Sequence, residues 1–390
     1  MSKMQEILTL NSISPKGIER LSSSLFHVAD DVEAPAGILV RSQNMHEMEL
    51  PESLLAIARA GAGTNNIPVD QCTARGVVVF NTPGANANAV KELTIAGLIL
   101  ASRNLAPALA WVEGLKGQGD AIAKLVEKGK SRFVGPELAG KRLGVIGLGA
   151  IGVKVANVAT HLGLEVYGYD PYISVEAAWN LSRNVIHCVN LNDLYSQCDL
   201  ITVHVPVTKD TTGLINSEAI AQMKQGVRIV NFARGELVDN SAMLAGVRTG
   251  RVGCYVCDFP AEELLGEPGV VALPHLGAST PESEENCAVM AADQLRDYLL
   301  NGNIRNSVNL PNVELPRVGG SRICVLHKNV PGMLSGITGA ASEAGLNIEN
   351  LVNKSRKDVA YTMLDVSGNV GGGVVARLKG LEGCIRVRII

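Results

Sequence analysis

Short apolar runs alternate with turn residues along most of the chain, and this pattern predicts buried strands separated by helices. Residues 37–40 and 77–80 are strand-like runs, and an apolar periodicity over about 89–102 predicts a helix. From residue 142 to residue 169 the pattern is strand, glycine turn, helix, strand. Further strands are predicted at 200–203, 228–231, 253–257 and 270–272. Strands that alternate with helices are typical of parallel βαβ units with both sheet faces covered.

A second pattern of predicted strands and helices begins after a linker at residues 310–320, which contains two prolines and the pair Gly319-Gly320. A helical pattern over about 280–300 precedes this linker. Prolines and paired glycines favour a domain boundary. The predicted elements beyond it are strands at 322–326, 347–354, 359–366 and 384–390 and helices at 333–344 and 374–378. Their order, βαββαβ, predicts a small ferredoxin-like domain.

Composition narrows the class of protein. Apolar residues make up 46% of the chain and charged residues 19%, which excludes global disorder. The 35 Lys and Arg against 38 Asp and Glu leave a net charge of −3, which argues against an electrostatic nucleic-acid binder. No apolar run reaches the ~18 residues of a membrane helix. The N-terminus also lacks the apolar region of a secretory signal, so we expect a cytoplasmic protein with reduced cysteines.

The segment Gly147-Leu148-Gly149-Ala150-Ile151-Gly152 is a G-x-G-x-x-G between a predicted strand and a predicted helix. The first glycine permits a tight turn, the second lets the backbone approach a pyrophosphate, and the third allows helix and strand to pack closely. Amides at the start of the helix then receive the phosphate charge. Asp170 follows the next strand, where a carboxylate accepts hydrogen bonds from ribose hydroxyls and repels a 2′-phosphate. The sequence therefore predicts NAD as the cofactor.

Three loops that follow late strands carry candidate groups for hydride-transfer chemistry. Such chemistry needs a base for the hydroxyl proton, a partner that holds this base, and a cation for the substrate. His275 is the candidate acid and base, Glu263 its carboxylate partner, and Arg234 a bidentate clamp for a substrate carboxylate. Spacing alone leaves a second interpretation open, in which Arg234 and Glu263 form a surface ion pair and His275 ends a loop.

The order of these blocks resembles the D-isomer-specific 2-hydroxyacid dehydrogenases. The matching blocks are residues 147–152, Asp170, residues 231–236, Asp258 with Glu263 five positions later, and Pro274-His275. The resemblance implies catalytic roles for Arg234, Glu263 and His275. Asp258-Phe259-Pro260 departs from the usual Asp-Val-Phe of the family, and Glu262 is the neighbouring alternative to Glu263. The resemblance also implies a cofactor site made of Gly147, Gly149, Ala150, Ile151, Gly152, Asp170, His204, Val205, Pro206, Phe232, Ala233, Arg234, Asp258, His275, Gly277 and Ala278.

The N-terminal part resembles the members of that family that oxidise D-3-phosphoglycerate to 3-phosphooxypyruvate, the first step of L-serine synthesis. A cation followed by a hydroxyl at a strand end can hold a phosphate, and a glycine-rich turn can offer amides to a carboxylate. The resemblance implies a substrate site of Arg41, Ser42, Ala62, Gly63, Asn86, Arg234 and His275. The alternatives are another D-2-hydroxyacid reductase, acting on hydroxypyruvate or glyoxylate, and a non-catalytic NAD-responsive binding protein.

Residues 320–390 resemble an ACT domain, a βαββαβ unit that binds amino acids between paired copies. In serine-regulated relatives matching residues hold L-serine across a subunit interface, which implies an effector site of His327, Asn329 and Asn347. The alternative is a domain that only oligomerises. We expect a homodimer or homotetramer without a nucleic-acid or membrane partner.

Cys254 and Cys257 form a C-x-x-C, a pattern that redox and metal sites share. Both lie in a predicted buried strand, where positions three apart face opposite sides of the sheet. The two sulfurs therefore diverge, and we expect structural thiols and no metal site.

Together these elements predict an α/β protein of three domains. Residues 1–95 and 283–315 form a discontinuous, flavodoxin-like substrate-binding domain. Residues 96–282 form a Rossmann-type doubly wound parallel sheet inserted into it, and 320–390 form the ACT regulatory domain. The active cleft is expected at the carboxyl ends of the parallel strands.

Overall fold

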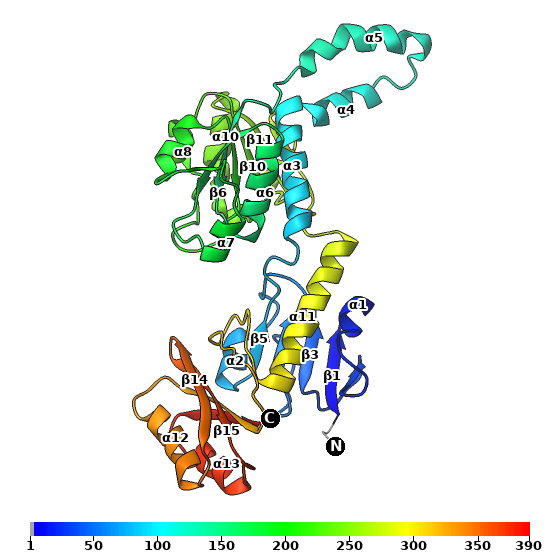
Figure 1. Cartoon of the computed structure of the whole chain (residues 1–390). Coiled ribbons are helices and arrows are strands. Elements are labelled where there is room, and N and C mark those ends of the chain that lie inside the picture. The colour runs from blue at the N-terminus through cyan, green and yellow to red at the C-terminus, as the bar shows by residue number, and fades with distance from the viewer. Residues whose placement is uncertain (1–3) are drawn as a thin grey trace. The chain divides into compact units, whose positions relative to one another are not determined.

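The computed structural model describes residues 4–390, and its chain divides into two compact units (Figure 1). Unit 1 contains the chain up to Asn86 together with Glu284–Ile390, and unit 2 is Ala87–Ser283. The first division falls just before helix α3 (Ala87–Arg103), whereas the predicted boundary at 95/96 would cut this helix. The C-terminal domain belongs to unit 1 in this division.

Unit 1 is built on a five-stranded parallel sheet with the order β2-β1-β3-β4-β5. This is the flavodoxin-like order, as predicted. Successive residues of a strand face opposite sides, so Ile7 and Leu8 of β1 enter separate apolar clusters on the two faces. The elements are β1 (Gln5–Leu10), α1 (Pro15–Ile18), β2 (Phe26–Ala29), β3 (Gly37–Val40), β4 (Ala56–Arg59), α2 (Val69–Ala74), β5 (Val78–Phe80) and α11 (Pro281–Asn301).

Unit 2 is built on a seven-stranded parallel sheet with the order β12-β11-β10-β9-β6-β7-β8. The order reverses at β6, which places the switch point of a Rossmann-type sheet beside the glycine turn. This confirms the predicted fold class. The strands are β6 (Arg142–Ile146), β7 (Glu165–Tyr169), β8 (Ile186–His187), β9 (Leu200–Val203), β10 (Val227–Asn231), β11 (Val252–Cys257) and β12 (Val270–Ala272).

Local sequence explains where several helices of unit 2 begin. Ser174, Asn190, Asn216 and Asp239 each accept a hydrogen bond from the backbone N–H three positions later, which satisfies one free amide of the first turn. The helices of the unit, besides α3 and two in a projecting arm, are α6 (Ala150–His161), α7 (Val175–Asn180), α8 (Leu191–Gln197), α9 (Ser217–Gln222) and α10 (Asn240–Arg248). Single turns of 3-10 helix, η3 (Gly235–Leu237) and η4 (Glu262–Leu264), follow β10 and β11.

The C-x-x-C pair lies as predicted, on opposite faces of the sheet of unit 2. Cys254 belongs to the buried cluster that contains Val256, and Cys257 belongs to the cluster that contains Tyr255. Burial raises the pKa of both thiols, that of Cys254 to about 11. Neither sulfur therefore has the character of a reactive thiolate.

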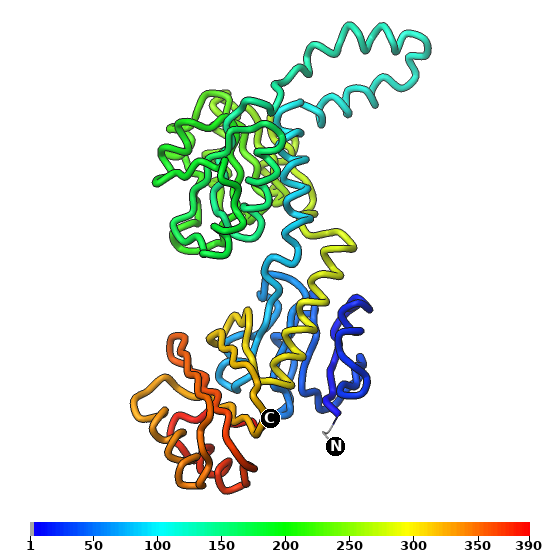
Figure 2. The backbone as a smooth tube through the Cα atoms, viewed as in Figure 1, coloured from blue at the N-terminus to red at the C-terminus, as the bar shows by residue number. Residues whose placement is uncertain are grey.

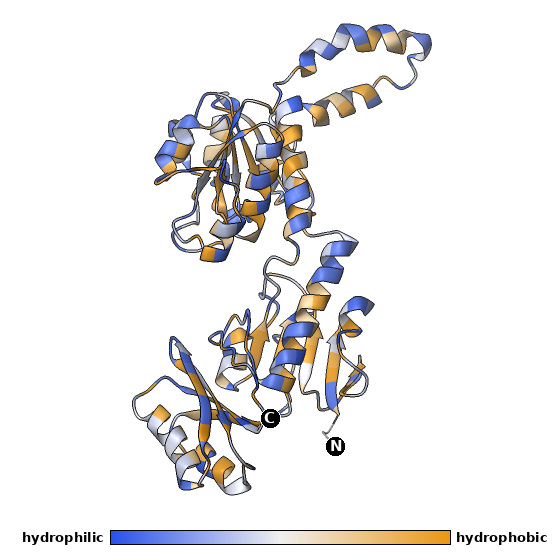
Figure 3. Cartoon of the chain, viewed as in Figure 1, coloured by the Kyte–Doolittle hydropathy of each residue, from blue (hydrophilic) through white to orange (hydrophobic). Residues whose placement is uncertain are grey.

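A helical arm leaves the body of unit 2 between residues 104 and 134 and is seen as a hairpin in Figure 2. It contains α4 (Leu105–Glu113) and α5 (Ile122–Gly129). Neither helix has a buried residue, although α4 is largely apolar, as its orange positions in Figure 3 show. Leu109 is 64% exposed, and Trp111 packs only within the arm, against Phe133 and Arg132. The arm is thus an apolar surface without a covering element in the described chain.

The C-terminal domain has a four-stranded antiparallel sheet with the order β14-β15-β13-β16. Together with the element order βαββαβ, this confirms the predicted ferredoxin-like module. The elements are β13 (Ser321–Lys328), α12 (Met333–Glu343), β14 (Ile348–Arg356), β15 (Val359–Val366), α13 (Gly372–Lys379) and β16 (Cys384–Ile389).

The C-terminal domain caps the end of α11 with arginine side chains. The last four carbonyls of a helix have no partner within the helix. In α11 these belong to residues 298–301. Arg388 donates to the first two at 3.2 and 2.9 Å, Arg317 of the linker donates to the third at 3.2 Å, and Arg322 donates to the fourth at 2.8 Å. The guanidinium charges also oppose the negative end of the helix dipole.

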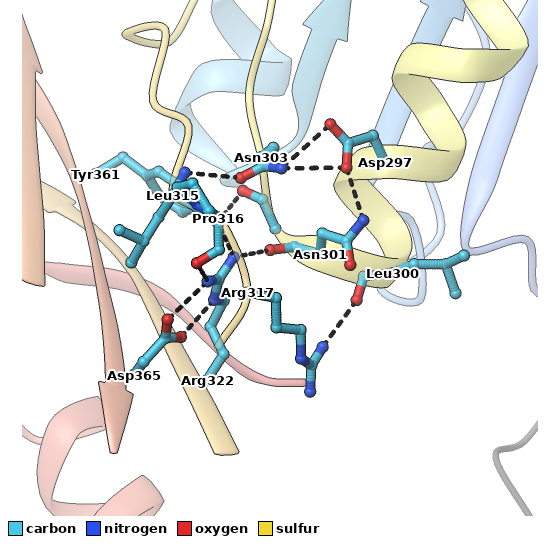
Figure 4. A network of polar contacts seen from close by, with 11 residues as sticks. Asp297, Leu300, Asn301, Asn303, Leu315, Pro316, Arg317, Arg322, Tyr361 and Asp365 are labelled. Carbon is cyan, nitrogen blue, oxygen red and sulfur yellow. Dashed lines mark hydrogen bonds and ion pairs between the residues drawn. The ribbon is translucent and has the colours of Figure 1, made fainter. Parts of the chain in front are cut away.

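Arg322 is the centre of this contact and uses all five of its N–H donors (Figure 4). Two of them bind the carboxylate of Asp365 at 2.6 and 2.8 Å. The other three bind the carbonyls of Asn301, Leu315 and Pro316 at 2.8, 2.9 and 3.2 Å. The Arg322 and Asp365 side chains are 0% and 1% exposed. One buried guanidinium on β13 therefore binds α11, the linker and β15 together.

Apolar packing joins the C-terminal domain to the rest of unit 1 as well. Cys324, Tyr361 and Met363 lie in the same buried cluster as Ile7 of β1 and Phe80 of β5. This shared core explains why the C-terminal domain groups with unit 1, although the linker composition favoured a separate domain.

The length and apolar composition of the helices determine whether any of them could cross a membrane. Within residues 4–390 no single helix is long and apolar enough to cross a bilayer. Only α3 and α4 taken together reach the required length and composition, and they are bent by 70° at their junction.

Candidate active site

The predicted catalytic and cofactor residues of unit 2 lie on loops at the carboxyl ends of its parallel strands. These ends meet at one edge of the sheet because the strands all run in the same direction. The glycine turn follows β6, Asp170 follows β7 and His204 follows β9. Arg234, Asp258 and His275 follow the neighbouring strands β10, β11 and β12. The fold therefore brings the predicted groups of this unit to a common edge.

The three glycines of the turn have distinct surroundings. Gly147 has a φ of +91°, and a Cβ there would lie 2.7 Å from the carbonyl oxygen of His204. A Cβ on Gly152 would lie 1.9 Å from the carbonyl oxygen of Gly147, so helix and turn pack too closely for any side chain. A Cβ on Gly149 would meet no atom within 4 Å. The open side of Gly149 at the start of α6 suits the approach of a pyrophosphate.

The carboxylate of Asp170 is held in place by backbone hydrogen bonds, one of them from the glycine turn. Its Oδ2 accepts a hydrogen bond from the backbone N–H of Leu148 at 2.8 Å, and its Oδ1 accepts one from Tyr172 at 2.8 Å. The carboxylate is thus held beside the glycine turn at the end of β7, where a dinucleotide fold places the acid that binds ribose hydroxyls.

Two buried polar atoms at this edge lack a partner within residues 4–390: Oδ1 of Asp258 and Nδ1 of His204. Asp258 is 0% exposed, and its Oδ2 accepts a hydrogen bond from Gly277 at 3.1 Å. Burial raises the pKa of this carboxyl, and burial lowers the pKa of His204 to about 4, so its imidazole is neutral. Unsatisfied buried groups are costly, and a bound amide or hydroxyl would satisfy them. These atoms therefore fit a dinucleotide such as NAD.

Arg234 lies on a loop shaped by a buried asparagine. Asn231 is 0% exposed; its Nδ2 donates to the carbonyl of Arg234 at 2.8 Å, and its Oδ1 accepts from the N–H of Ala233 at 3.1 Å. The exposed guanidinium of Arg234 donates one hydrogen bond, to the carbonyl of Ala233 at 2.6 Å. Its other donors point to no acceptor in the described chain, which leaves them available to a carboxylate.

The predicted hydrogen bond between His275 and Glu263 is not formed among the described residues. Glu263 instead accepts a hydrogen bond from Asn240 at 2.9 Å, which lowers the pKa of its carboxyl. The exposed His275 ring packs against Phe259 with centroids 4.6 Å apart. Glu262 forms no hydrogen bond or ion pair with the imidazole within residues 4–390 either. Catalytic hydrogen bonds are often long without substrate and tighten on binding, so the pairing stays a prediction.

The structure places one predicted cofactor residue away from the open edge. The side chain of Phe232 is 4% exposed and packs into the core against α3, where a Cβ on Gly97 would lie 2.7 Å from its ring. Only its backbone remains at the end of β10. The apolar ring is buried because it fills the space beside a helical glycine, and a cofactor role for this position stays a prediction.

The predicted substrate residues of unit 1 cluster at the carboxyl ends of β3 and β4. Arg41 follows β3 and forms an ion pair with Glu284 of α11. The amides of Ser42 and Gln43 both donate to Oδ1 of Asn11, at 3.0 and 2.6 Å. Ala62 and Gly63 lie in the turn after β4, and Asn86 is the last residue of this part of unit 1.

Sequence reasoning missed Arg59, which ends β4 directly opposite Val40 of β3. Its Nε donates to the carbonyl of Arg41 at 3.0 Å, so two arginines lie at neighbouring strand ends. A Cβ on Gly61 would lie 2.5 Å from the Arg59 guanidinium, which explains the glycine in this turn. The signal was a basic residue two positions before the glycine-rich segment 61–63.

The predicted effector residues do not meet within one chain. His327 is 3% exposed, and its ring nitrogens bond to Thr362 at 2.9 Å and to the carbonyl of Lys328 at 2.7 Å. His327 pairs with Ala360 of β15, whereas the carbonyl of Asn347 accepts a hydrogen bond from the N–H of Ser367 just past the other end of β15, about 20 Å away by strand rise. Asn329 is exposed and donates to the carbonyl of Lys357. An effector site built from these residues would need a second chain.

No group of three or more His, Cys, Asp or Glu side chains that could hold a metal ion is found within residues 4–390.

Comparison with known proteins agrees with this architecture. The family description "D-isomer specific 2-hydroxyacid dehydrogenase, NAD binding domain" matches residues 95–277. The D-3-phosphoglycerate dehydrogenase of Haemophilus influenzae is 33% identical over 367 residues, which cover 91% of this chain and 86% of the relative. The chain belongs to the D-isomer-specific 2-hydroxyacid dehydrogenase family. It is an NAD-dependent dehydrogenase, and NAD is its cofactor.

Other members of the 2-hydroxyacid dehydrogenase family extend the comparison. The D-3-phosphoglycerate dehydrogenase of Methanocaldococcus jannaschii is 37% identical over 278 residues, or 70% of this chain, and the chain spans 51% of that relative. A crystal structure of NAD+-bound 3-phosphoglycerate dehydrogenase from Entamoeba histolytica has a TM-score of 0.61 at 26% identity, covering 78% of this chain and 99% of that chain.

Proposed function

We propose that this 2-hydroxyacid dehydrogenase oxidises D-3-phosphoglycerate to 3-phosphooxypyruvate, the first step of L-serine synthesis. The observation that carries the proposal is the pair of arginines, Arg41 and Arg59, at neighbouring strand ends of unit 1. A 2-hydroxy acid without a phosphate needs one cation for its carboxylate, which Arg234 supplies, and a phosphorylated substrate needs further cations. The D-3-phosphoglycerate dehydrogenase names of the relatives support this substrate.

In the proposed reaction each end of the substrate has its own charged group. Arg234 holds the carboxylate through the fork of its guanidinium, and Arg41 with Arg59 holds the phosphate. His275 accepts the proton of the C2 hydroxyl as the hydride leaves C2. Glu263 stays ionised because its hydrogen bond from Asn240 lowers its pKa, so it can stabilise the imidazolium that forms. NAD, when bound, supplies the acceptor for the hydride.

The proposed function is tested by initial rates of NADH oxidation with 3-phosphooxypyruvate, hydroxypyruvate and 2-oxoglutarate measured side by side. We expect the highest kcat/KM with 3-phosphooxypyruvate. A higher value with hydroxypyruvate would make the protein a reductase of non-phosphorylated acids instead. Absence of turnover with all three, together with NADH binding, would favour a binding protein that does not catalyse.

Arg234→Lys is expected to raise the KM for 3-phosphooxypyruvate by about 10- to 100-fold, which is the ~1.5–3 kcal/mol of a charge-assisted hydrogen bond. Lysine keeps the charge but cannot make two parallel hydrogen bonds to one carboxylate. The Kd for NADH should not change. Arg248→Lys is the matched control, because Arg248 is exposed and pairs only with Glu267. Equal KM values for the two variants would contradict the proposed clamp.

We also propose that the protein is a homo-oligomer in which a second copy covers the helical arm at residues 104–134. Contiguous exposed apolar surface on an ordered element favours a protein interface. Leu109→Asp is expected to lower the molecular mass seen by sedimentation velocity to that of one chain. Val175→Asp serves as the control, since Val175 is 75% exposed on α7, outside the arm. A wild-type protein that sediments as a single chain would contradict this proposal.

The remaining proposals concern location and regulation. A cytoplasmic location is supported by the eight cysteines, which all lie within residues 4–390 and form no disulfide there. L-Serine as an effector of the C-terminal domain stays a prediction. It now requires a partner chain, because His327 and Asn347 lie at opposite ends of β15.

A further inference from the structure

An acidic side chain already binds the arginine that is proposed to hold the substrate phosphate. Glu284 lies in the first turn of α11 and forms an ion pair with Nη2 of Arg41, at the end of β3. Both residues belong to unit 1, although 243 positions separate them in the sequence. A carboxylate and a phosphate present similar oxygen acceptors to a guanidinium. The structure therefore shows Arg41 bound to an internal anion.

The backbone amides beside Arg41 are not available to bind an anion. The backbone amides of Ser42 and Gln43 are already used by Oδ1 of Asn11. The carbonyl of Arg41 accepts the Nε–H of Arg59, which holds the loop in place. An incoming phosphate at this position consequently competes with Glu284 for the side chain of Arg41.

The ion pair is accessible enough to be exchanged. The side chains of Arg41 and Glu284 are 43% and 42% exposed, so water and ions reach both. Exposed ion pairs contribute little to stability, and a guanidinium binds phosphate oxygens with the same paired hydrogen bonds that it offers to a carboxylate. Glu284 is also favoured where it lies, because acids are stabilised at a helix N-terminus.

We propose that Glu284 is a specificity-determining residue that weakens the binding of phosphorylated substrates by competing for Arg41. This inference rests on the proposed phosphate-binding role of Arg41. It concerns the phosphate end of the substrate alone. A non-phosphorylated 2-oxo acid therefore does not displace Glu284, and its KM is independent of this residue.

The test compares Glu284→Gln with Glu285→Gln. Glutamine keeps the size of the side chain and removes the competing charge. Glu285 is the matched control, since it is the next residue of α11 and pairs with Lys16 instead of Arg41. We expect Glu284→Gln to lower the KM for 3-phosphooxypyruvate and the Ki for inorganic phosphate by about three- to fivefold. The kcat and the KM for hydroxypyruvate should stay at their wild-type values, as should all constants of Glu285→Gln.

The outcomes separate this inference from the proposed function. If the wild-type enzyme does not prefer 3-phosphooxypyruvate to hydroxypyruvate, and Arg41→Met changes neither KM, the proposed substrate is wrong. If Arg41→Met raises the KM for 3-phosphooxypyruvate but Glu284→Gln leaves it unchanged, Glu284 does not compete. A higher KM in Glu284→Gln would show that Glu284 orients Arg41 for the phosphate, and this too would overturn the proposal.

Discussion

His275→Ala is expected to lower kcat by about 10²- to 10⁴-fold, the usual contribution of a general acid or base. Without the imidazole no group at the end of β12 can take the hydroxyl proton as the hydride leaves. The Kd for NADH, measured by the quenching of protein fluorescence or by NADH fluorescence, should not change. The glycine turn and Asp170 are anchored on β6 and β7 and do not depend on this side chain.

His187→Ala provides the control for this experiment. His187 is an exposed residue of β8 in the same unit and is not part of the proposed machinery. Its replacement should leave kcat and KM at their wild-type values. Equal turnover in the two histidine variants would remove His275 from the mechanism. It would also leave the second interpretation of the sequence standing, in which the histidine only ends a loop.

The parts of this site that the sequence predicts well are those that depend on backbone conformation and on close packing of the backbone. Glycines 147, 149 and 152 are read from spacing alone, because one needs a positive φ, one an open side and one close packing. Asp170 is read in the same way, since its place at the end of β7 follows from the βαβ pattern. The divergence of Cys254 and Cys257 follows from the two-residue period of a strand.

Contacts that depend on side-chain direction could not be predicted from the sequence. Nothing in the spacing of Glu263 and His275 shows that Asn240 binds the glutamate or that Phe259 packs on the imidazole. The burial of the Phe232 ring could not be predicted for the same reason, since its neighbour Gly97 lies far away in the sequence. The direction of such a side chain is determined by neighbours that are distant in the sequence, and the alternation of apolar residues carries no information about them.

The contacts of the linker at residues 310–320 also could not be predicted from the sequence. Its prolines and glycines predict a domain boundary, yet Arg317 and Arg322 bind the end of α11 in the structure. An arginine directly before the apolar run 323–326 is the one signal of this contact, because a buried guanidinium requires a carboxylate and several carbonyls. Its partners lie on α11, the linker and β15, and no local pattern connects them.

Asp365→Asn is expected to lower the free energy of unfolding of unit 1 by about 3–5 kcal/mol, the usual effect of breaking a buried ion pair by removal of one partner. Asparagine has nearly the same volume as aspartate, so no cavity is formed. The substitution leaves the guanidinium of Arg322 buried without a counter-charge, and the hydrogen bond to Asp365 that raises the pKa of Arg322 is lost. The measurement is the midpoint of urea unfolding followed by circular dichroism.

Glu343→Gln is the matched control, because Glu343 pairs with Arg377 in the same domain and both side chains are more than half exposed. Exposed pairs contribute about 0–1 kcal/mol, so its unfolding midpoint should barely move. If Asp365→Asn were no more destabilising than Glu343→Gln, the arginine contact would not hold the C-terminal domain to α11. The shared apolar cluster around Tyr361 and Met363 would then be the main attachment, and Tyr361→Ala would have the larger effect.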